Sequence, residues 1–229
     1  RFLSEAKNRE LGRPMKAGLR SEKRFYRSIV KQVKRLAEIK VDLLLAVSTN
    51  HPELVRYLST QTPGWILRLL AKWPTARRLA NAKPETVAQI KGITMERAIE
   101  LVSQANSSVG CSMAKSDELT LQMLAGEVRE LKVKIKRWKT QLEEIMAGDP
   151  AVLILQSIPG IALWSAIAIR LEIGDFADFP RAAGLVAYSG LDPTPKSSGD
   201  GHSTGVISKR GSSNLRAVLF MCAFVACTG

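Results

Sequence analysis

The chain is poor in cysteine, histidine and aromatic residues. It has three cysteines and two histidines among 229 residues, and aromatic residues make up 6%. The cysteines are odd in number and lack the spacing of metal ligands, which argues against a disulfide framework and a zinc site. His51 and His202 have no partner at ligand spacing. We therefore expect a reduced, cytoplasmic protein whose own residues bind no metal.

Acidic residues are also scarce relative to basic ones. Lys and Arg number 34 against 21 Asp and Glu, which gives a net charge of +13 and a pI near 10.0. Such a chain attracts a phosphate backbone whatever its base sequence, and salt weakens the attraction. The apolar run 217–227 is too short to span a bilayer, and the run 151–171 is broken by Pro159-Gly160. The composition favours a nucleic-acid partner and no membrane.

Convincing strand patterns are missing too, so the sequence predicts a mostly α protein. We expect residues 1–20 to be a basic irregular segment and residues 21–147 a helical linker with short helices at 50–106. Residues 148–229 are then a compact helical C-terminal domain. Ser21 is the expected cap of a helix that runs to about Val47, and Ser116 the cap of a second long helix.

The 116–147 helix has apolar residues spaced alternately by three and four. They are Leu121, Leu124, Val128, Leu131, Ile135, Trp138, Leu142 and Ile145. This heptad seam predicts a coiled coil with a second copy, or an antiparallel hairpin with the 21–47 helix. Basic residues on the outer faces of both helices are expected to contact nucleic acid, or to be merely solvated. Those assigned to the contact are Lys31, Lys34, Arg35, Lys132, Lys136 and Arg137.

Two glycine turns have the spacing of a helix-hairpin-helix element. Ile158-Pro159-Gly160-Ile161 is followed by Ala166, and Ile90, Gly92, Ile93 and Ala98 repeat the same offsets. In such a hairpin the glycine lets the backbone approach a phosphate. Gly160 is therefore a candidate nucleic-acid contact. Tight helix packing through small residues is the alternative, and we favour it for both turns.

A long polar segment, residues 189–216, separates two apolar segments. It contains Ser198 directly before Gly199, and long loops in compact domains are usually functional. Its cations are Lys196, Lys209, Arg210 and Arg216. A hydroxyl beside fixed positive charge favours chemistry on phosphate, whereas a plain polar surface loop is the alternative. Glu172, Asp175 and Asp178 lie close in sequence and raise the question of a two-metal site, but we favour a helix end and turn.

The C-terminal third resembles the bridge-RNA-guided insertion-sequence transposases, which include the Piv-type DNA invertases. The resemblance rests on the order and spacing of five pieces between Ile158 and Ala226. These are IPGI at Ile158–Ile161, LEIGDFADFP at Leu171–Pro180, AAGLVAYSGLDP at Ala182–Pro193, SG at 198–199 and ISKRGSSNLR at Ile207–Arg216. The helical middle fits that family's coiled-coil linker more loosely.

The resemblance implies that Ser198 is the nucleophile of a DNA transposase or recombinase. It also implies an N-terminal RuvC-like domain whose four carboxylates hold magnesium, and we expect this chain to begin after that domain and to be inactive alone. The implied partners are insertion-sequence ends, target DNA, a structured guide RNA and further copies of the chain, joined through the 116–147 helix. The implied setting is a prokaryotic nucleoid.

Two other functions compete with this interpretation. One is a non-catalytic helical nucleic-acid-binding module, in which Ser198→Ala changes no nucleic-acid property. The other is a coiled-coil assembly subunit whose basic faces are only solvated, which predicts weak nucleic-acid binding and a stable oligomer.

Overall fold

The computed structural model describes residues 17–58, 62–111, 114–193 and 206–228. Over these residues the chain is helical, with one isolated antiparallel bridge and no longer strand. The mostly α prediction is therefore confirmed. The chain divides into two compact units. We call residues 30–137 the middle unit, and the described residues among 1–29 and 138–229 the terminal unit.

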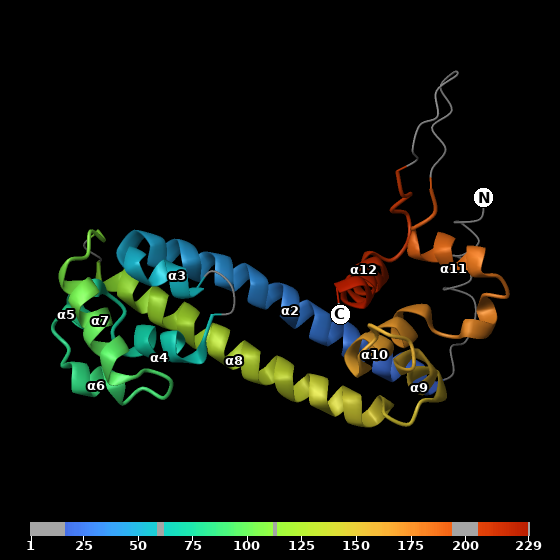
Figure 1. Cartoon of the computed structure of the whole chain (residues 1–229), viewed down its shortest axis with the longest axis horizontal. Helices are drawn as coiled ribbons and strands as arrows, with labels where there is room; N and C mark the ends of the chain where they lie inside the picture. The colour runs from blue at the N-terminus through green and yellow to red at the C-terminus, as the bar shows by residue number, and fades with distance from the viewer. Residues whose placement is uncertain (1–16, 59–61, 112–113, 194–205, 229) are drawn as a thin grey trace, which may run out of the picture. The chain divides into compact units, whose positions relative to one another are not determined.

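Two long helices, α2 (Ala17–Asn50) and α8 (Lys115–Met146), contribute to both units (Figure 1). The middle unit adds η1 (Pro52–Leu54), α3 (Val55–Leu58), α4 (Gly64–Lys72), α5 (Ala76–Ala80), α6 (Pro84–Ala88) and α7 (Met95–Asn106). The terminal unit adds α9 (Pro150–Gln156), α10 (Leu163–Ile173), η2 (Phe176–Asp178), α11 (Ala182–Ser189) and α12 (Ser213–Thr228).

The long helices begin earlier than the expected serine caps. Ser21 lies inside α2, and Ser116 is the second residue of α8. The first turn of α8 is closed instead by Asp117, whose Oδ2 accepts a hydrogen bond from the Ala114 amide at 3.1 Å. Serine is tolerated inside a helix, so a serine near an expected start does not by itself fix the boundary.

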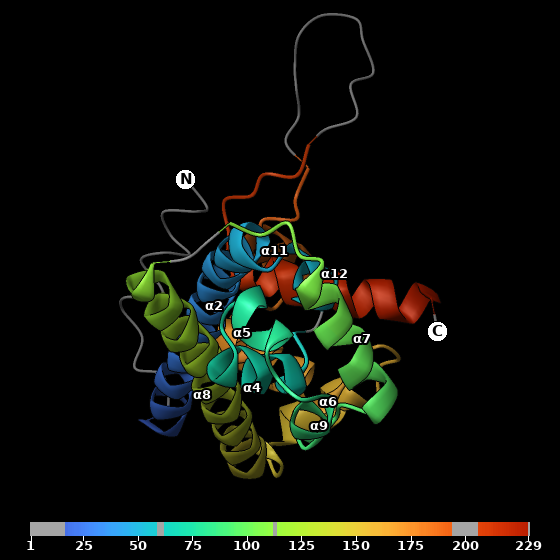
Figure 2. The same cartoon turned by 90° about the vertical axis from the view of Figure 1, so that its left-hand side faces the viewer.

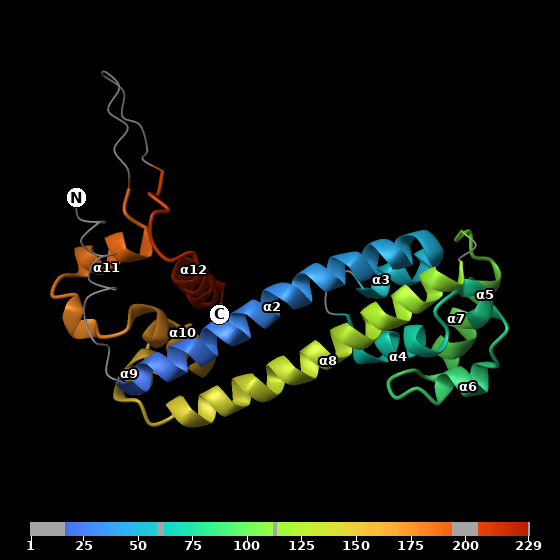
Figure 3. The same cartoon turned by 180° about the vertical axis from the view of Figure 1, so that it is seen from behind.

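In each unit a part of α2 lies beside a part of α8 and runs in the opposite direction (Figures 1 and 3). In the middle unit the Arg35 guanidinium pairs with the Glu127 carboxylate. In the terminal unit the rings of Phe25 and Trp138 lie 5.8 Å apart between centroids. This is the antiparallel pairing that the heptad pattern left open beside self-association.

The buried stripe of α8 follows the heptad seam in its centre and leaves it at the end. Leu131, Ile135 and Leu142 are buried, but Ile145 is 58% exposed and Met146 is 4% exposed in its place. An α-helix has 3.6 residues per turn, so a strict 3.5-residue repeat drifts by about 20° per heptad. Over the length of α8 this drift moves the last seam position off the buried face.

The short helices of the middle unit form a compact layer of their own. Figure 2 looks onto them, and α7 packs against α5 and α6. Thr75 caps α5 and Thr94 caps α7, since each hydroxyl accepts from the amide three residues on. The threonines thus satisfy amides that the helix starts leave unpaired.

The core of the terminal unit lies between α10 and α12. Its centre is Ile169, Ile173, Leu215 and Cys222. Asp149 caps α9 by accepting from the amides of residues 151 and 152, and its carboxylate lies 3.3 Å from the Arg170 guanidinium. Among the described helices, none combines the length and apolar character that crossing a membrane requires.

Candidate nucleic-acid site at the loop stem

Residues 190–193 and 206–211, which we call the loop stem, flank the 194–205 segment of the expected polar loop. Pro193 and Ile207 make an antiparallel bridge. The Ser208 amide donates to the Asp192 carbonyl at 2.8 Å, and the Lys209 amide donates to the Gly190 carbonyl at 3.0 Å. The stem therefore brings the two ends of the loop together by backbone hydrogen bonds. Ser198 and Lys196 lie in the loop, outside the described residues.

Two glycines allow the end of α11 and the segment before α12 to approach each other closely. Gly190 ends α11 with φ +70°, and a Cβ on it would lie 2.6 Å from the Gly211 nitrogen. A Cβ on Gly211 would overlap the Tyr188 carbonyl oxygen. At each position the backbone of the other segment occupies the space that a Cβ would need. The close approach of the two segments therefore requires glycine at both positions.

Arg216, for which a phosphate contact stays a prediction, hydrogen-bonds to the backbone at the stem. Its Nη1 donates to the Ser189 carbonyl at 3.0 Å and to the Gly211 carbonyl at 2.9 Å. The first carbonyl belongs to the last residue of α11, and the second to the last residue of the stem. The guanidinium therefore ties the end of α11 to the start of α12.

Lys209 and Arg210 are both exposed at the stem. Lys209 has φ +54°, an uncommon value for a residue with a side chain. In sequence, these two cations follow shortly after the segment that contains Ser198. Four cations of the 189–216 segment were expected to bind phosphate. Among those that the structure describes, Lys209 and Arg210 have exposed side chains and Arg216 is half-buried.

Glu172 forms a polar contact with the start of α12 that the sequence interpretation missed. Its side chain is buried, and its carboxylate accepts from Ser212 Oγ and from Asn214 Nδ2, each at 3.2 Å. Burial, with the Glu172 charge as a second cause, raises the pKa of Tyr26 to about 12. The available signal was an acidic residue inside the apolar LWSAIAIRLEI helix, which needs donors if it is buried.

The other two acidic residues do not join Glu172 in a metal site. Asp175 caps η2 by accepting from the Ala177 amide at 3.1 Å, and Asp178 lies within η2. Within the part of the chain that the structure describes, no three His, Cys, Asp or Glu side chains are grouped as metal ligands. The helix end and turn that we favoured is what these residues form.

Gly160 packs against α12. Its φ is +84°, and a Cβ would lie 2.6 Å from the Cys222 carbonyl oxygen and 2.9 Å from the Ala226 Cβ. This close approach accounts for the glycine by helix packing, the alternative that we favoured. The expected phosphate contact at Gly160 stays a prediction, and the packing does not support it.

The comparisons with known proteins concern this same region. Residues 152–228 match the transposase IS116/IS110/IS902 family. We refer to them below as the transposase-like domain. They contain α10, α11, α12, the loop stem and the buried Glu172. No solved structure matches the chain.

Curated relatives extend the similarity beyond that domain. The chain is 26% identical over 181 residues to the "Insertion element IS110 uncharacterized 43.6 kDa protein" of Streptomyces coelicolor, which covers 76% of the chain and 45% of that protein. It is 33% identical over 99 residues to a "Probable family 20 transposase" of Pseudomonas aeruginosa, with 43% and 29% covered. It is 25% identical over 152 residues to the "Transposase for insertion sequence element IS1111A" of Coxiella burnetii, with 62% and 42% covered. The chain spans less than half the length of these relatives.

The basic faces of α2 and α8 lie outside the transposase-like domain. Lys31, Lys34, Lys136 and Arg137 are exposed, whereas Arg35 is exposed but paired with Glu127. Lys132 differs, because its Nζ donates to the Thr62 carbonyl at 2.6 Å. Burial lowers the pKa of Lys132, and the charge of Lys40 lowers it further. The structure thus leaves four of these six cations without a described intramolecular role.

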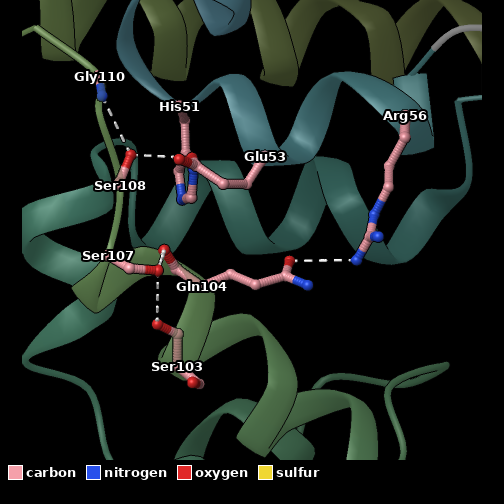
Figure 4. Close-up of polar contacts among 8 residues, drawn as sticks. All are labelled: His51, Glu53, Arg56, Ser103, Gln104, Ser107, Ser108 and Gly110. Carbon is pink, nitrogen blue, oxygen red and sulfur yellow. Dashed lines mark hydrogen bonds and ion pairs between the residues drawn. The ribbon is translucent and has the colours of Figure 1, made fainter.

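A second polar cluster, half-buried, lies in the middle unit around Glu53 (Figure 4). His51 Nδ1 lies 3.2 Å from Glu53 Oε2, and Ser108 Oγ donates to the same oxygen at 2.9 Å. The Gly110 amide donates to Ser108 Oγ at 3.2 Å. Ser108 is bonded to the carboxylate and not to the imidazole, so this is not a nucleophile and base pair. The cluster fastens residues 108–110 to the segment that follows α2.

Proposed function

We propose that this chain is the linker and C-terminal part of a DNA transposase that cuts and rejoins insertion-sequence and target DNA. The match of residues 152–228 to a transposase family supports this proposal most directly. The loop stem supports it physically, because it holds both ends of the segment that contains Ser198-Gly199. Since the chain spans only part of its relatives, the activity is proposed for the whole protein.

In the proposed reaction Ser198 Oγ attacks a phosphodiester phosphorus. The new bond is Oγ–P, the bond that breaks joins phosphorus to one deoxyribose oxygen, and the serine proton is transferred to that oxygen. A strand hydroxyl then attacks the phosphoserine, which forms the recombined phosphodiester and returns the serine with its proton. Lys209 and Arg210 are our candidates to stabilise the charge that builds on the phosphate oxygens.

Magnesium is part of this proposal only for the whole protein. Glu172 and Asp175 do not fit a metal site, because Glu172 bonds to Ser212 and Asn214 and Asp175 caps η2. We therefore derive no step through magnesium in this chain. The carboxylates that would hold it are expected in the RuvC-like domain that the resemblance implies.

A guide RNA and self-association complete the proposal. The exposed cations of α2 and α8 are suited to a phosphate backbone. The seam of α8 is largely buried within the chain, so a second copy would have to use other surfaces of α8. The 119, 123 and 133 positions of α8 are apolar and more than half exposed.

The deciding experiment is a search for a covalent protein–DNA adduct with the whole protein. Ser198→Ala is expected to abolish the adduct and strand cleavage while nucleic-acid binding persists. Ser197→Ala, one residue earlier in the same loop, is the matched control and should leave the adduct intact. An adduct that persists in Ser198→Ala, or that maps to another residue, removes the assignment. Unchanged nucleic-acid chemistry in that variant would favour the non-catalytic module.

Nucleic-acid binding by this chain is tested separately across a salt series. Log affinity should fall linearly with log salt, by about 0.9 per neutralised phosphate on duplex DNA and about 0.7 on single strands. A flat response would contradict backbone binding. A stable oligomer with only weak binding would favour the assembly subunit.

A further inference from the structure

The Glu172 side chain connects the core of the terminal unit to the first turn of α12. It projects from α10 with a residue exposure of 4%, and both of its carboxylate oxygens have a donor from residues 212–214. Burying a carboxylate is costly unless hydrogen bonds replace water. Both side-chain donors come from a single turn. The Glu172 carboxylate therefore keeps its hydrogen bonds only while that turn stays in this position.

The same turn is also bound to the loop stem. Ser212 Oγ accepts from the Leu215 amide at 3.2 Å, which caps α12. One turn further, Arg216 donates to the Ser189 carbonyl at the end of α11 and to the Gly211 carbonyl of the stem. Residues 211–216 are therefore held by Glu172 on one side and by the end of α11 on the other.

The Glu172 backbone also forms hydrogen bonds to other helices. Its carbonyl oxygen accepts from Tyr188 Oη of α11 at 3.0 Å and from Lys23 Nζ of α2 at 3.3 Å. Tyr188 directly precedes Ser189 and Gly190, where the stem begins. One residue of α10 thus contacts the segments at both ends of the 189–212 stretch.

We propose that Glu172 is a positioning residue for the loop stem, whose two parts flank the segment that contains Ser198. It acts through Ser212 and Asn214. Their hydrogen bonds hold the start of α12 in place and thereby orient residues 206–211, which directly precede it. The consequence for catalysis rests on the proposed function. In that reaction Glu172, Asn214 and Arg216 hold the stem, while Lys209 and Arg210 remain exposed to contact phosphate.

The test is an isosteric substitution, Asn214→Asp, in the full chain. It keeps the shape of the side chain but replaces a donor by a second carboxylate opposite Glu172, and like charges at this range repel. An acidic residue in the first turn of a helix is otherwise favourable, so α12 itself gives no reason for a loss. We expect hydrogen exchange of the Ser208 and Lys209 amides to speed up by about tenfold or more. The amides of α9 should keep their protection.

The rescue is the double variant Glu172→Gln with Asn214→Asp. The amide introduced at position 172 can donate to the carboxylate introduced at position 214, while its oxygen still accepts from Ser212. Exchange at Ser208 and Lys209 should therefore return to within about twofold of the parent. Ser213→Asp adds the same charge at an exposed neighbouring position and is the matched control. It should leave the stem unchanged.

Three results would overturn the proposal. They are an unchanged stem in Asn214→Asp, equal acceleration in α9 and the stem, and no recovery in the double variant. Adduct formation by the whole protein is measured in parallel and should fall and recover with the stem. If the parent forms no adduct, the proposed function fails, while the exchange experiment still decides the role of Glu172.

Discussion

Two glycine turns with the same sequence spacing have different surroundings in the two units. Gly92 joins α6 to α7 with φ +99°, and Gly160 joins α9 to α10 with φ +84°. The nearest neighbour of a Cβ would be the Trp65 Cβ at 3.4 Å in the first case and the Cys222 carbonyl oxygen at 2.6 Å in the second. The motif thus specifies a backbone turn, and the elements packed on it decide whether there is space for a side chain at the glycine.

The two units also differ in the acidic residue that each one bonds, because Glu172 is buried whereas Glu53 is half-buried. Glu53 in the middle unit bonds to His51 and Ser108, and Glu172 in the terminal unit bonds to Ser212 and Asn214. Both fasten a connecting segment to a helical core. The cluster around Glu53 contains a histidine and the described cluster around Glu172 does not, so the two units should respond differently to acid.

The largest expected effect comes from adding a methyl group to each glycine turn. Gly160→Ala combines positive-φ strain with a clash against the α12 backbone, and should lower the free energy of unfolding by about 3 kcal/mol or more. Gly92→Ala has the strain but only a contact at the edge of van der Waals range, so about 1–3 kcal/mol is expected. Urea unfolding followed by circular dichroism measures both. Equal losses would show that the packing of α12 does not distinguish the turns.

The seam of α8 offers the next largest difference. Leu142→Ala removes a fully buried side chain and should cost about 2–5 kcal/mol. Ile145→Ala, three residues on, removes a side chain that is 58% exposed and should cost less than about 1 kcal/mol. The pair is compared by thermal unfolding, with sedimentation to detect association. A large cost at Ile145, or a change of mass there, would mean that a partner covers this position.

The pH response should differ between the two polar clusters, around Glu53 and around Glu172. Burial lowers the pKa of His51 from its ordinary value of 6.5, and the contact with Glu53 only partly opposes this. The unfolded chain then binds more protons than the folded chain as the pH falls, so stability is present above about pH 6.5 and is lost below it. Hydrogen exchange of residues 108–111 should therefore quicken as the pH falls below about 6.5.

The control for that prediction is His51→Gln, which cannot gain the proton. Its exchange at residues 108–111 should no longer depend on pH in that range. A parent whose exchange, corrected for the intrinsic pH effect, stays constant would contradict a role for His51. The same acceleration in the loop stem would contradict the difference between the units.

The smallest expected effect on stability is at Arg35. Its ion pair with Glu127 is exposed, with side-chain exposures of 59% and 36%, so Arg35→Ala should change the free energy of unfolding by less than about 1 kcal/mol. If Arg35 also contacts nucleic acid, the salt slope should fall by about 0.9 on duplex DNA. Arg78→Ala, which breaks a comparable pair with Glu118, is the control. An unchanged slope removes Arg35 from the interface.

The sequence by itself determined the helices and much of the packing pattern. Apolar spacing located α2 and α8, and the two glycine turns marked the connections between α6 and α7 and between α9 and α10. These signals are local, because helix periodicity and capping depend on residues within a few positions. The similarity of residues 152–228 to a transposase family was likewise readable from the order of short motifs.

Only the tertiary structure decided what the polar residues of those motifs do. Arg216 and Lys209 look alike as cations in one basic cluster, yet Arg216 is bonded to two carbonyls and Lys209 is exposed. Glu172 looked like a metal ligand or a helix end until α12 brought Ser212 and Asn214 to it. Such roles depend on contacts between residues about 40 positions apart. Local spacing does not encode them, because the packing of α10 against α12 brings these groups together.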